Sequence, residues 1–192
     1  MLIKSWKTGA VELFLYKERP AAEMPPGWKS LVALQEVNRA TDMGSSVRAH
    51  TFLQSRLLLR QHLAKALKQN PAQIKISVEN GKPLLPGGEI AFSLSHAHGH
   101  ILIGLLENIE PRRGEAAQQR RRLGVDLEWI DEKRDMKKIL ERLGVTEDLP
   151  LDEAFRRWCE YEARYKCGAD GTMASGTEAT PDGRFCWAVC AG

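Results

Sequence analysis

The chain has 192 residues, of which 43% are hydrophobic and 28% are charged, and this composition excludes a chain that is disordered throughout. Its net charge of +3 is too small to indicate nucleic-acid binding by itself. No apolar run is long enough to span a bilayer and the N-terminal residues lack the apolar core of a signal peptide, so we expect a cytoplasmic protein with neither a membrane nor a nucleic-acid partner.

The first half of the chain predicts a strand, a loop and a long helix. Residues 11–16 read as the strand and the proline-rich residues 21–27 as the loop. After "GSS", whose serines can cap a helix, residues 47–68 place apolar side chains on one side at helical spacing, and Pro71 prevents continuation. The apolar side consists of Phe52, Leu59, Leu63 and Leu67.

The rest of the chain predicts mostly strands, which gives a mixed α and β layout. We expect strands at residues 74–78, 89–95, 100–107, 123–130 and 184–190, with a turn and loop at 79–88. Residues 131–143 are predicted to be helical, and residues 169–183, rich in Gly, Ser and Thr, to be a loose segment.

An arginine-rich link joins two of these strands. Residues 108–122 are more than a hairpin needs, so we expect an exposed insertion loop. Its arginines could attract an acidic partner, or simply keep the loop solvated. An RNA-binding surface would also need interleaved aromatic residues, which the link lacks. The arginines are Arg112, Arg113, Arg120, Arg121 and Arg122.

Cysteines and histidines give only weak signals of a metal site. His96, His98 and His100 alternate, so a strand could present all three to Zn²⁺ or Ni²⁺, but Gly99 favours a turn that breaks the face. The spacing of the four cysteines is unlike that of paired zinc knuckles, and in a reducing compartment we expect free thiols. The cysteines are Cys159, Cys167, Cys186 and Cys190.

The strand at residues 123–130 carries two carboxylates on one face. Successive side chains of an extended chain point to opposite faces, so Asp126 and Glu128 share the face opposite Val125, Leu127 and Trp129. Like charges at this spacing repel, unless the face is wet or a cation lies between them.

A helix predicted at residues 151–168 supplies a third carboxylate. Glu162 occupies a position of the apolar stripe where leucine would be expected, and Lys166 follows four residues later. An internal pair of Glu162 with Lys166 is one interpretation. Alternatively, Glu162 joins Asp126 and Glu128 in a carboxylate set that suits Mg²⁺. The stripe consists of Leu151, Ala154, Phe155, Trp158 and Tyr165.

Five short motifs follow one another along the chain. They are "FLQSRLLLR" from Phe52, "NGKPLL" from Asn80, "FSLSHAHG" from Phe92, "GVDLE" from Gly124 and "WCEYEARYK" from Trp158. The last has the pattern W-x-x-x-E-A-x-x-K. Together they resemble the 4'-phosphopantetheinyl transferases of the surfactin-synthetase-activating type, over about residues 39–168. Asp-x-Glu at a strand end is common, but five motifs in order at compatible spacings are specific.

This resemblance implies an α+β fold of two related lobes, with the second shortened. Residues 1–107 would form the first lobe, which binds coenzyme A, residues 108–122 the insertion loop, and residues 123–192 the second lobe with the metal-binding strand and helix. Such enzymes move the phosphopantetheine arm of coenzyme A onto a serine of an acidic apo carrier protein and depend on Mg²⁺. We expect the chain to act as a monomer.

The resemblance also implies roles for individual residues. Asp126, Glu128 and Glu162 would hold Mg²⁺, Glu162 would also take the serine proton, and Lys166 would contact the phosphate that is attacked. Coenzyme A carries a 3'-phosphate and an adenine, and the residues implied to bind them would otherwise be read as ordinary surface or structural side chains. They are Lys82, Ser95, His96, Arg39 and Arg48.

Two departures from the family pattern bear on activity. Tyr161 stands where many relatives have lysine before the catalytic glutamate. After Lys166, relatives continue through a glycine-rich segment and several strands, whereas only 26 residues follow here. The alternative function is therefore a catalytically degenerate module that binds coenzyme A or a carrier protein.

Overall fold

The protein is described by a computed structural model that covers residues 1–79, 81–107, 121–168 and 170–192. Of the predicted insertion loop, only Arg121 and Arg122 fall within these ranges. No helix in the covered ranges is long and apolar enough to cross a membrane.

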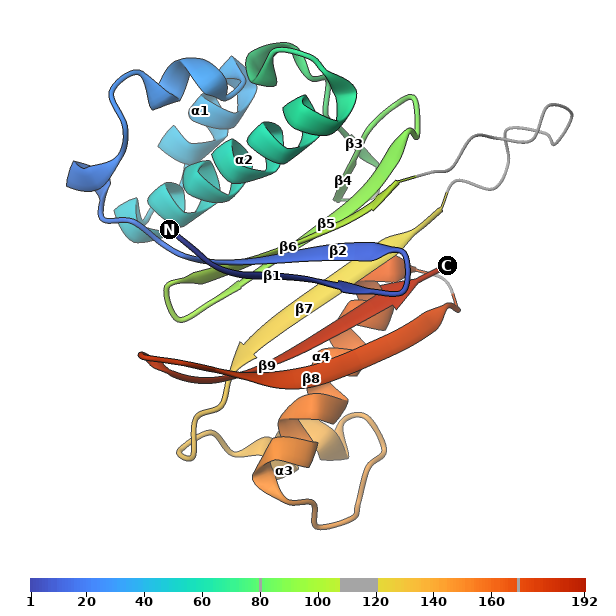
Figure 1. The fold of residues 1–192 in the computed structure, drawn as a ribbon. Helices are drawn as coiled ribbons and strands as arrows, with labels where there is room; N and C mark the ends of the chain where they lie inside the picture. The colour runs from blue at the N-terminus through green and yellow to red at the C-terminus, as the bar shows by residue number, and fades with distance from the viewer. Residues whose placement is uncertain (80, 108–120, 169) are drawn as a thin grey trace, which may run out of the picture.

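One antiparallel sheet carries helices on its outer face (Figure 1). Its strands lie in the order β1 (Leu2–Thr8), β2 (Val11–Lys17), β6 (His100–Glu107) and β5 (Ile90–Ala97). The covering helices are α1 (Leu34–Thr41) and α2 (Ser46–Leu67). Leu59 and Leu63 of α2 are buried against the sheet together with Ile101 and Ile103, as the predicted apolar side of this helix requires.

Short elements connect the long ones. A two-stranded ribbon of β3 (Ser77–Glu79) and β4 (Lys82–Leu84) lies between α2 and β5. Single 3-10 turns occur at Ala21–Glu23, Trp28–Leu31 and Pro71–Gln73.

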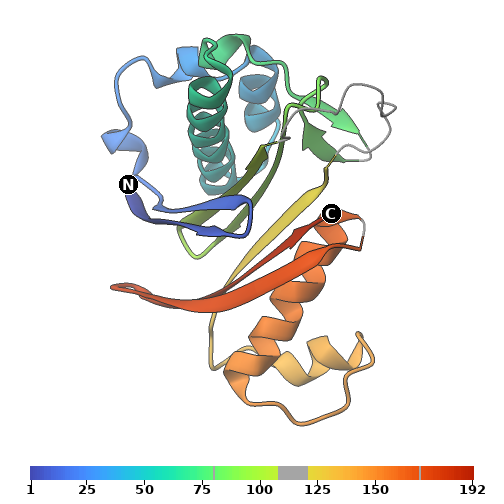
Figure 2. The ribbon, with the colours of Figure 1, turned by 45° about the vertical axis from the view of Figure 1, so that its right-hand side comes forward.

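A second antiparallel sheet is covered by helices on the side away from the first sheet. Its strands lie in the order β7 (Leu123–Trp129), β9 (Gly183–Ala191) and β8 (Thr172–Thr180). Its helices are α3 (Met136–Glu141) and α4 (Leu151–Cys167). Figures 1 and 2 show the resulting succession of helices, sheet, sheet and helix. The mixed α and β class predicted from the sequence is confirmed.

The two sheets bury their inner faces against each other. Leu13 and Leu15 of β2 share one apolar cluster with Val125 and Leu127 of β7 and with Phe185 of β9. Val125 and Leu127 thus face the first sheet, which leaves Asp126 and Glu128 facing α4, as the alternation of side chains predicts.

Two predictions for the backbone were wrong. Residues 169–183 are not loose throughout, because β8 pairs with β9 along its whole length, and a hairpin partner outweighs the weak strand preference of Gly and Ser. Of residues 131–143, only α3 is helical. The side chains of Asp131 and Asp135 accept hydrogen bonds from the backbone N–H groups of Lys133 and Lys138, which favours a turn followed by a helix cap.

Smaller differences concern short elements. The sequence patterns missed β1 and α1, and they placed β4 in a loop. Of the strand predicted at 74–78, only the end forms a paired strand, as part of β3 (Ser77–Glu79). In α4 the buried stripe runs through Phe155, Cys159, Ala163 and Cys167, whereas Tyr165, which we predicted to lie in the core, is 68% exposed.

Candidate functional site

The free edge of β7 is held by side chains rather than by another strand. The N–H of Val125 donates to Ser93 Oγ over 3.0 Å, and the C=O of Val125 accepts from Lys166 Nζ over 3.2 Å. Ser93 comes from β5 and Lys166 from α4. Buried backbone groups require partners, so these two bonds fix β7 between the first sheet and α4.

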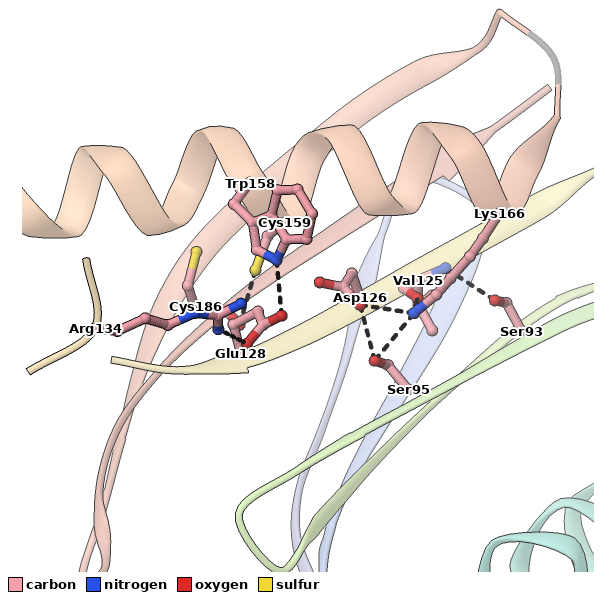
Figure 3. Close-up of polar contacts among 10 residues, drawn as sticks. All are labelled: Ser93, Ser95, Val125, Asp126, Glu128, Arg134, Trp158, Cys159, Lys166 and Cys186. Carbon is pink, nitrogen blue, oxygen red and sulfur yellow. Dashed lines mark hydrogen bonds and ion pairs between the residues drawn. The ribbon is translucent and has the colours of Figure 1, made fainter. Parts of the chain in front are cut away.

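A buried carboxylate, a lysine and a serine form a single network at this edge (Figure 3). Lys166 Nζ lies 2.6 Å from Asp126 Oδ1 and 3.1 Å from Ser95 Oγ, and the Ser95 hydroxyl donates to the same Asp126 oxygen over 2.9 Å. Asp126 is only 4% exposed. A buried carboxylate needs such a cation, so Lys166 is one answer to the repulsion expected between Asp126 and Glu128.

The second oxygen of Asp126 has no partner. Asp126 Oδ2 is buried and accepts no hydrogen bond from any residue that the structure describes. A buried oxygen of this kind is costly unless water, a ligand or an ion satisfies it. The Asp126 carboxylate therefore has a free coordinating position.

Glu128 is held at both of its oxygens. The indole N–H of Trp158 donates to Oε1 over 2.8 Å, and Arg134 Nη1 donates to Oε2 over 2.6 Å. Figure 3 shows Glu128 on the same side of β7 as Asp126, below α4. Arg134 is thus a second cation beside the carboxylate pair.

Glu162 is the least restrained of the three carboxylates. Within the described part of the chain its side chain makes no hydrogen bond or ion pair. Burial, followed by the negative charge of Asp126, raises the pKa of Glu162, while Lys166 counteracts the increase. The pair of Glu162 with Lys166 that the helix spacing allowed is therefore not formed, because Lys166 binds Asp126 instead.

The donor set fits a hard divalent cation by its chemistry. Asp126 offers a buried oxygen without a partner, and Glu162 offers an unpaired carboxylate whose pKa responds to the charges of Asp126 and Glu128. The carboxylates do not converge on one point, since no three His, Cys, Asp or Glu side chains in the described ranges are grouped closely enough to hold a metal.

The comparisons with known proteins add no identity: neither a protein-family model nor a curated protein sequence matches this chain.

The residues predicted to bind coenzyme A lie in two places. Ser95 belongs to the Lys166 network, and Lys82 Nζ reaches the end of α4, where it donates to the C=O of Tyr165 over 2.9 Å. Arg39 and Arg48 lie on α1 and α2, where both are exposed. The Arg39 guanidinium lies 5.2 Å from the ring centroid of Phe52.

The histidines separate rather than converge. His96 is exposed at the end of β5. His98 has a positive φ of 47° and stacks on Trp129 with ring centroids 4.1 Å apart. His100 is buried, and its Nδ1 donates to the C=O of His98 over 2.9 Å. The alternative of a three-histidine site was wrong, because the turn at Gly99 sends the side chains in different directions.

Sequence reasoning missed two polar residues of the site. Ser93 lies two positions before Ser95 on the same face of β5, so strand alternation could have indicated it. Arg134 gave no local signal, since it lies in an irregular segment whose path depends on the packing of α3.

Proposed function

We propose that the protein transfers the 4'-phosphopantetheine arm of coenzyme A to a serine of an apo acyl or peptidyl carrier protein. One observation carries this proposal: three of the sequence motifs meet in one hydrogen-bond network. Ser95 from "FSLSHAHG", Asp126 from "GVDLE" and Lys166 from "WCEYEARYK" lie within 3.1 Å of one another through their polar atoms. The two-layer arrangement of a sheet and covering helices, present twice, is compatible with two related lobes.

The residues would divide the chemistry among them. Asp126 and Glu162, with Glu128, would hold Mg²⁺, which supplies positive charge to the pyrophosphate oxygens as negative charge develops there. Lys166 would turn from Asp126 toward the phosphate and stabilise the same charge. Glu162 would also accept the serine proton, directly or through water.

The rival function is a binding module without catalysis. It draws support from Tyr161, which is 46% exposed where many relatives of the resembled family carry a lysine. Such a module would bind coenzyme A or a carrier protein through the same basic residues.

Intact mass separates the two functions. The protein is incubated with coenzyme A, Mg²⁺ and a panel of apo carrier proteins, and a carrier that gains one phosphopantetheine group identifies the enzyme. Lys166→Met should abolish the gain, whereas Lys137→Met, an exposed lysine on α3, should leave it unchanged. Absence of transfer to every carrier, together with a rise in melting temperature on adding coenzyme A, would favour the binding module.

Recognition of the 3'-phosphate can be tested by ligand-induced stabilisation. Coenzyme A at about 100 times its dissociation constant should add roughly 2.7 kcal/mol, and 3'-dephospho-coenzyme A should stabilise less at the same concentration. His96→Ala should reduce the difference between the two ligands. Equal stabilisation by both would remove His96 and its basic neighbours from the cofactor site.

A further inference from the structure

Glu128 differs from the other proposed metal ligands because neither of its oxygens is free. Trp158 holds Oε1 and Arg134 holds Oε2. In contrast, Asp126 keeps one oxygen without a partner, and the Glu162 carboxylate makes no bond within the described part of the chain. The two partners of Glu128 are also unequal, since the indole of Trp158 is neutral and the guanidinium of Arg134 carries a full positive charge.

The guanidinium of Arg134 has a defined position in the fold. Its carbon lies 5.7 Å from the ring centroid of Phe155, and its side chain is 33% exposed. The backbone on either side is fixed as well, because the N–H of Arg134 donates to the C=O of Asp131 over 3.1 Å and the C=O of Arg134 accepts from the N–H of Met136 over 2.8 Å. The ion pair with Glu128 is therefore part of the fold between β7 and α3.

A cation seated on a ligand carboxylate opposes a second cation in two ways. The hydrogen bond occupies an oxygen that a metal would coordinate, and the positive charge repels a dication nearby. The indole of Trp158 is neutral, so it occupies Oε1 of Glu128 without repelling a metal ion.

We propose that Arg134 competes with the metal for Glu128 and so sets the affinity of the site for divalent cations. This inference rests on the proposed Mg²⁺ site. Release of the Arg134 guanidinium would free Oε2, while the indole of Trp158 keeps the carboxylate oriented through Oε1. Arg134 is thus a positioning residue that lowers the affinity for metal, and its removal should strengthen binding.

Binding of Mn²⁺ to the full chain, followed by electron paramagnetic resonance without coenzyme A or carrier protein, tests the proposal. Arg134→Gln should bind Mn²⁺ roughly tenfold more tightly than the wild type, because it removes the positive charge that pairs with Glu128 and repels a dication there. Arg134→Lys retains the charge and should stay close to the wild type. Arg142→Gln, at an exposed position after α3, makes the same charge change away from Glu128 and should have no effect.

The Arg134→Gln substitution in a Glu128→Gln variant tests whether the change in Mn²⁺ affinity depends on Glu128. With Glu128→Gln present, adding Arg134→Gln should tighten binding less than it does in the wild type, because the competition for the carboxylate is already gone and only the charge repulsion is relieved. Equal or weaker Mn²⁺ affinity in Arg134→Gln, or equal tightening in Arg142→Gln, would overturn the proposal even if the wild type binds Mn²⁺ and transfers phosphopantetheine. Absence of Mn²⁺ binding in every variant would instead overturn the metal site itself.

Discussion

Asp126 binds Lys166 and Ser95 through the same oxygen, so a change at one residue removes a hydrogen bond from each of the other two. Asp126→Ala and Lys166→Met should each lower the free energy of unfolding by about 1–3 kcal/mol, because each leaves a desolvated polar group. The double variant should lose less than the sum, by about 0.5–3 kcal/mol. Urea denaturation of the four proteins measures this coupling. Strict additivity would show that the pair contributes nothing in solution.

Glu162 makes stability depend on pH through its raised pKa. A folded-state pKa above the ordinary value of about 4.5 means that ionisation favours the unfolded chain. The contribution of Glu162 to stability is full below that ordinary value and is lost as pH rises through the folded pKa. Glu162→Gln should therefore raise the urea midpoint at neutral pH, and the gain should vanish in acid. A gain of equal size at all pH values would contradict the assigned cause.

Contact between β7 and α4 depends on Gly124, the first residue of "GVDLE". A Cβ atom at this position would lie 2.0 Å from the C=O oxygen of Ala163 and 2.5 Å from the backbone nitrogen of Cys167, so α4 would have to move. Gly124→Ala should lower the free energy of unfolding by about 3 kcal/mol or more. Gly44→Ala is the matched control, because no atom lies within 4 Å of its Cβ position, and it should change stability by less than about 0.5 kcal/mol. Comparable losses in both would refute the close approach.

Elements with a strong local pattern were predictable, and elements stabilised by a distant partner were not. The apolar side of α2, the alternation of β5 and β7 and the continuous apolar run of β6 specify their own structure. In contrast, β8 has small and polar residues that form a strand because β9 lies beside it. The same holds for β1, which is mostly exposed and forms a strand because β2 lies beside it.

In the site, too, the local patterns were predictable and the long-range contacts were not. Strand alternation indicated that Asp126 and Glu128 share a face, and helical spacing brought Glu162 and Lys166 to one side of α4. Which cation would neutralise which carboxylate was not predictable, because Lys166 reaches Asp126 across 40 residues of chain and Arg134 reaches Glu128 from an irregular turn. Such pairings depend on how β7 and α4 pack, and no local pattern contains that information.

The whole molecule should unfold as one unit, because its two sheets share an apolar cluster. Leu15 of β2 is 1% exposed within that cluster. Leu15→Ala should lower the free energy of unfolding by about 2–5 kcal/mol. Far-ultraviolet circular dichroism and tryptophan fluorescence should then shift together, although Trp158 and Trp187 lie in the other sheet and its helix. Separate transitions for the two signals would mean that the lobes fold independently.

All four cysteines lie between α4 and β9, and none is more than 3% exposed. Burial raises the pKa of Cys190 to about 11, so little thiolate forms in the native protein at neutral pH. A thiol-labelling reagent should therefore not react with the native protein, and should react only when α4 separates from β9. The labelling rate then measures how often α4 separates from β9, and the natural cysteines serve as the probe. Glu162 and Lys166 belong to the same helix, so ligands that bind to them should lower the labelling rate.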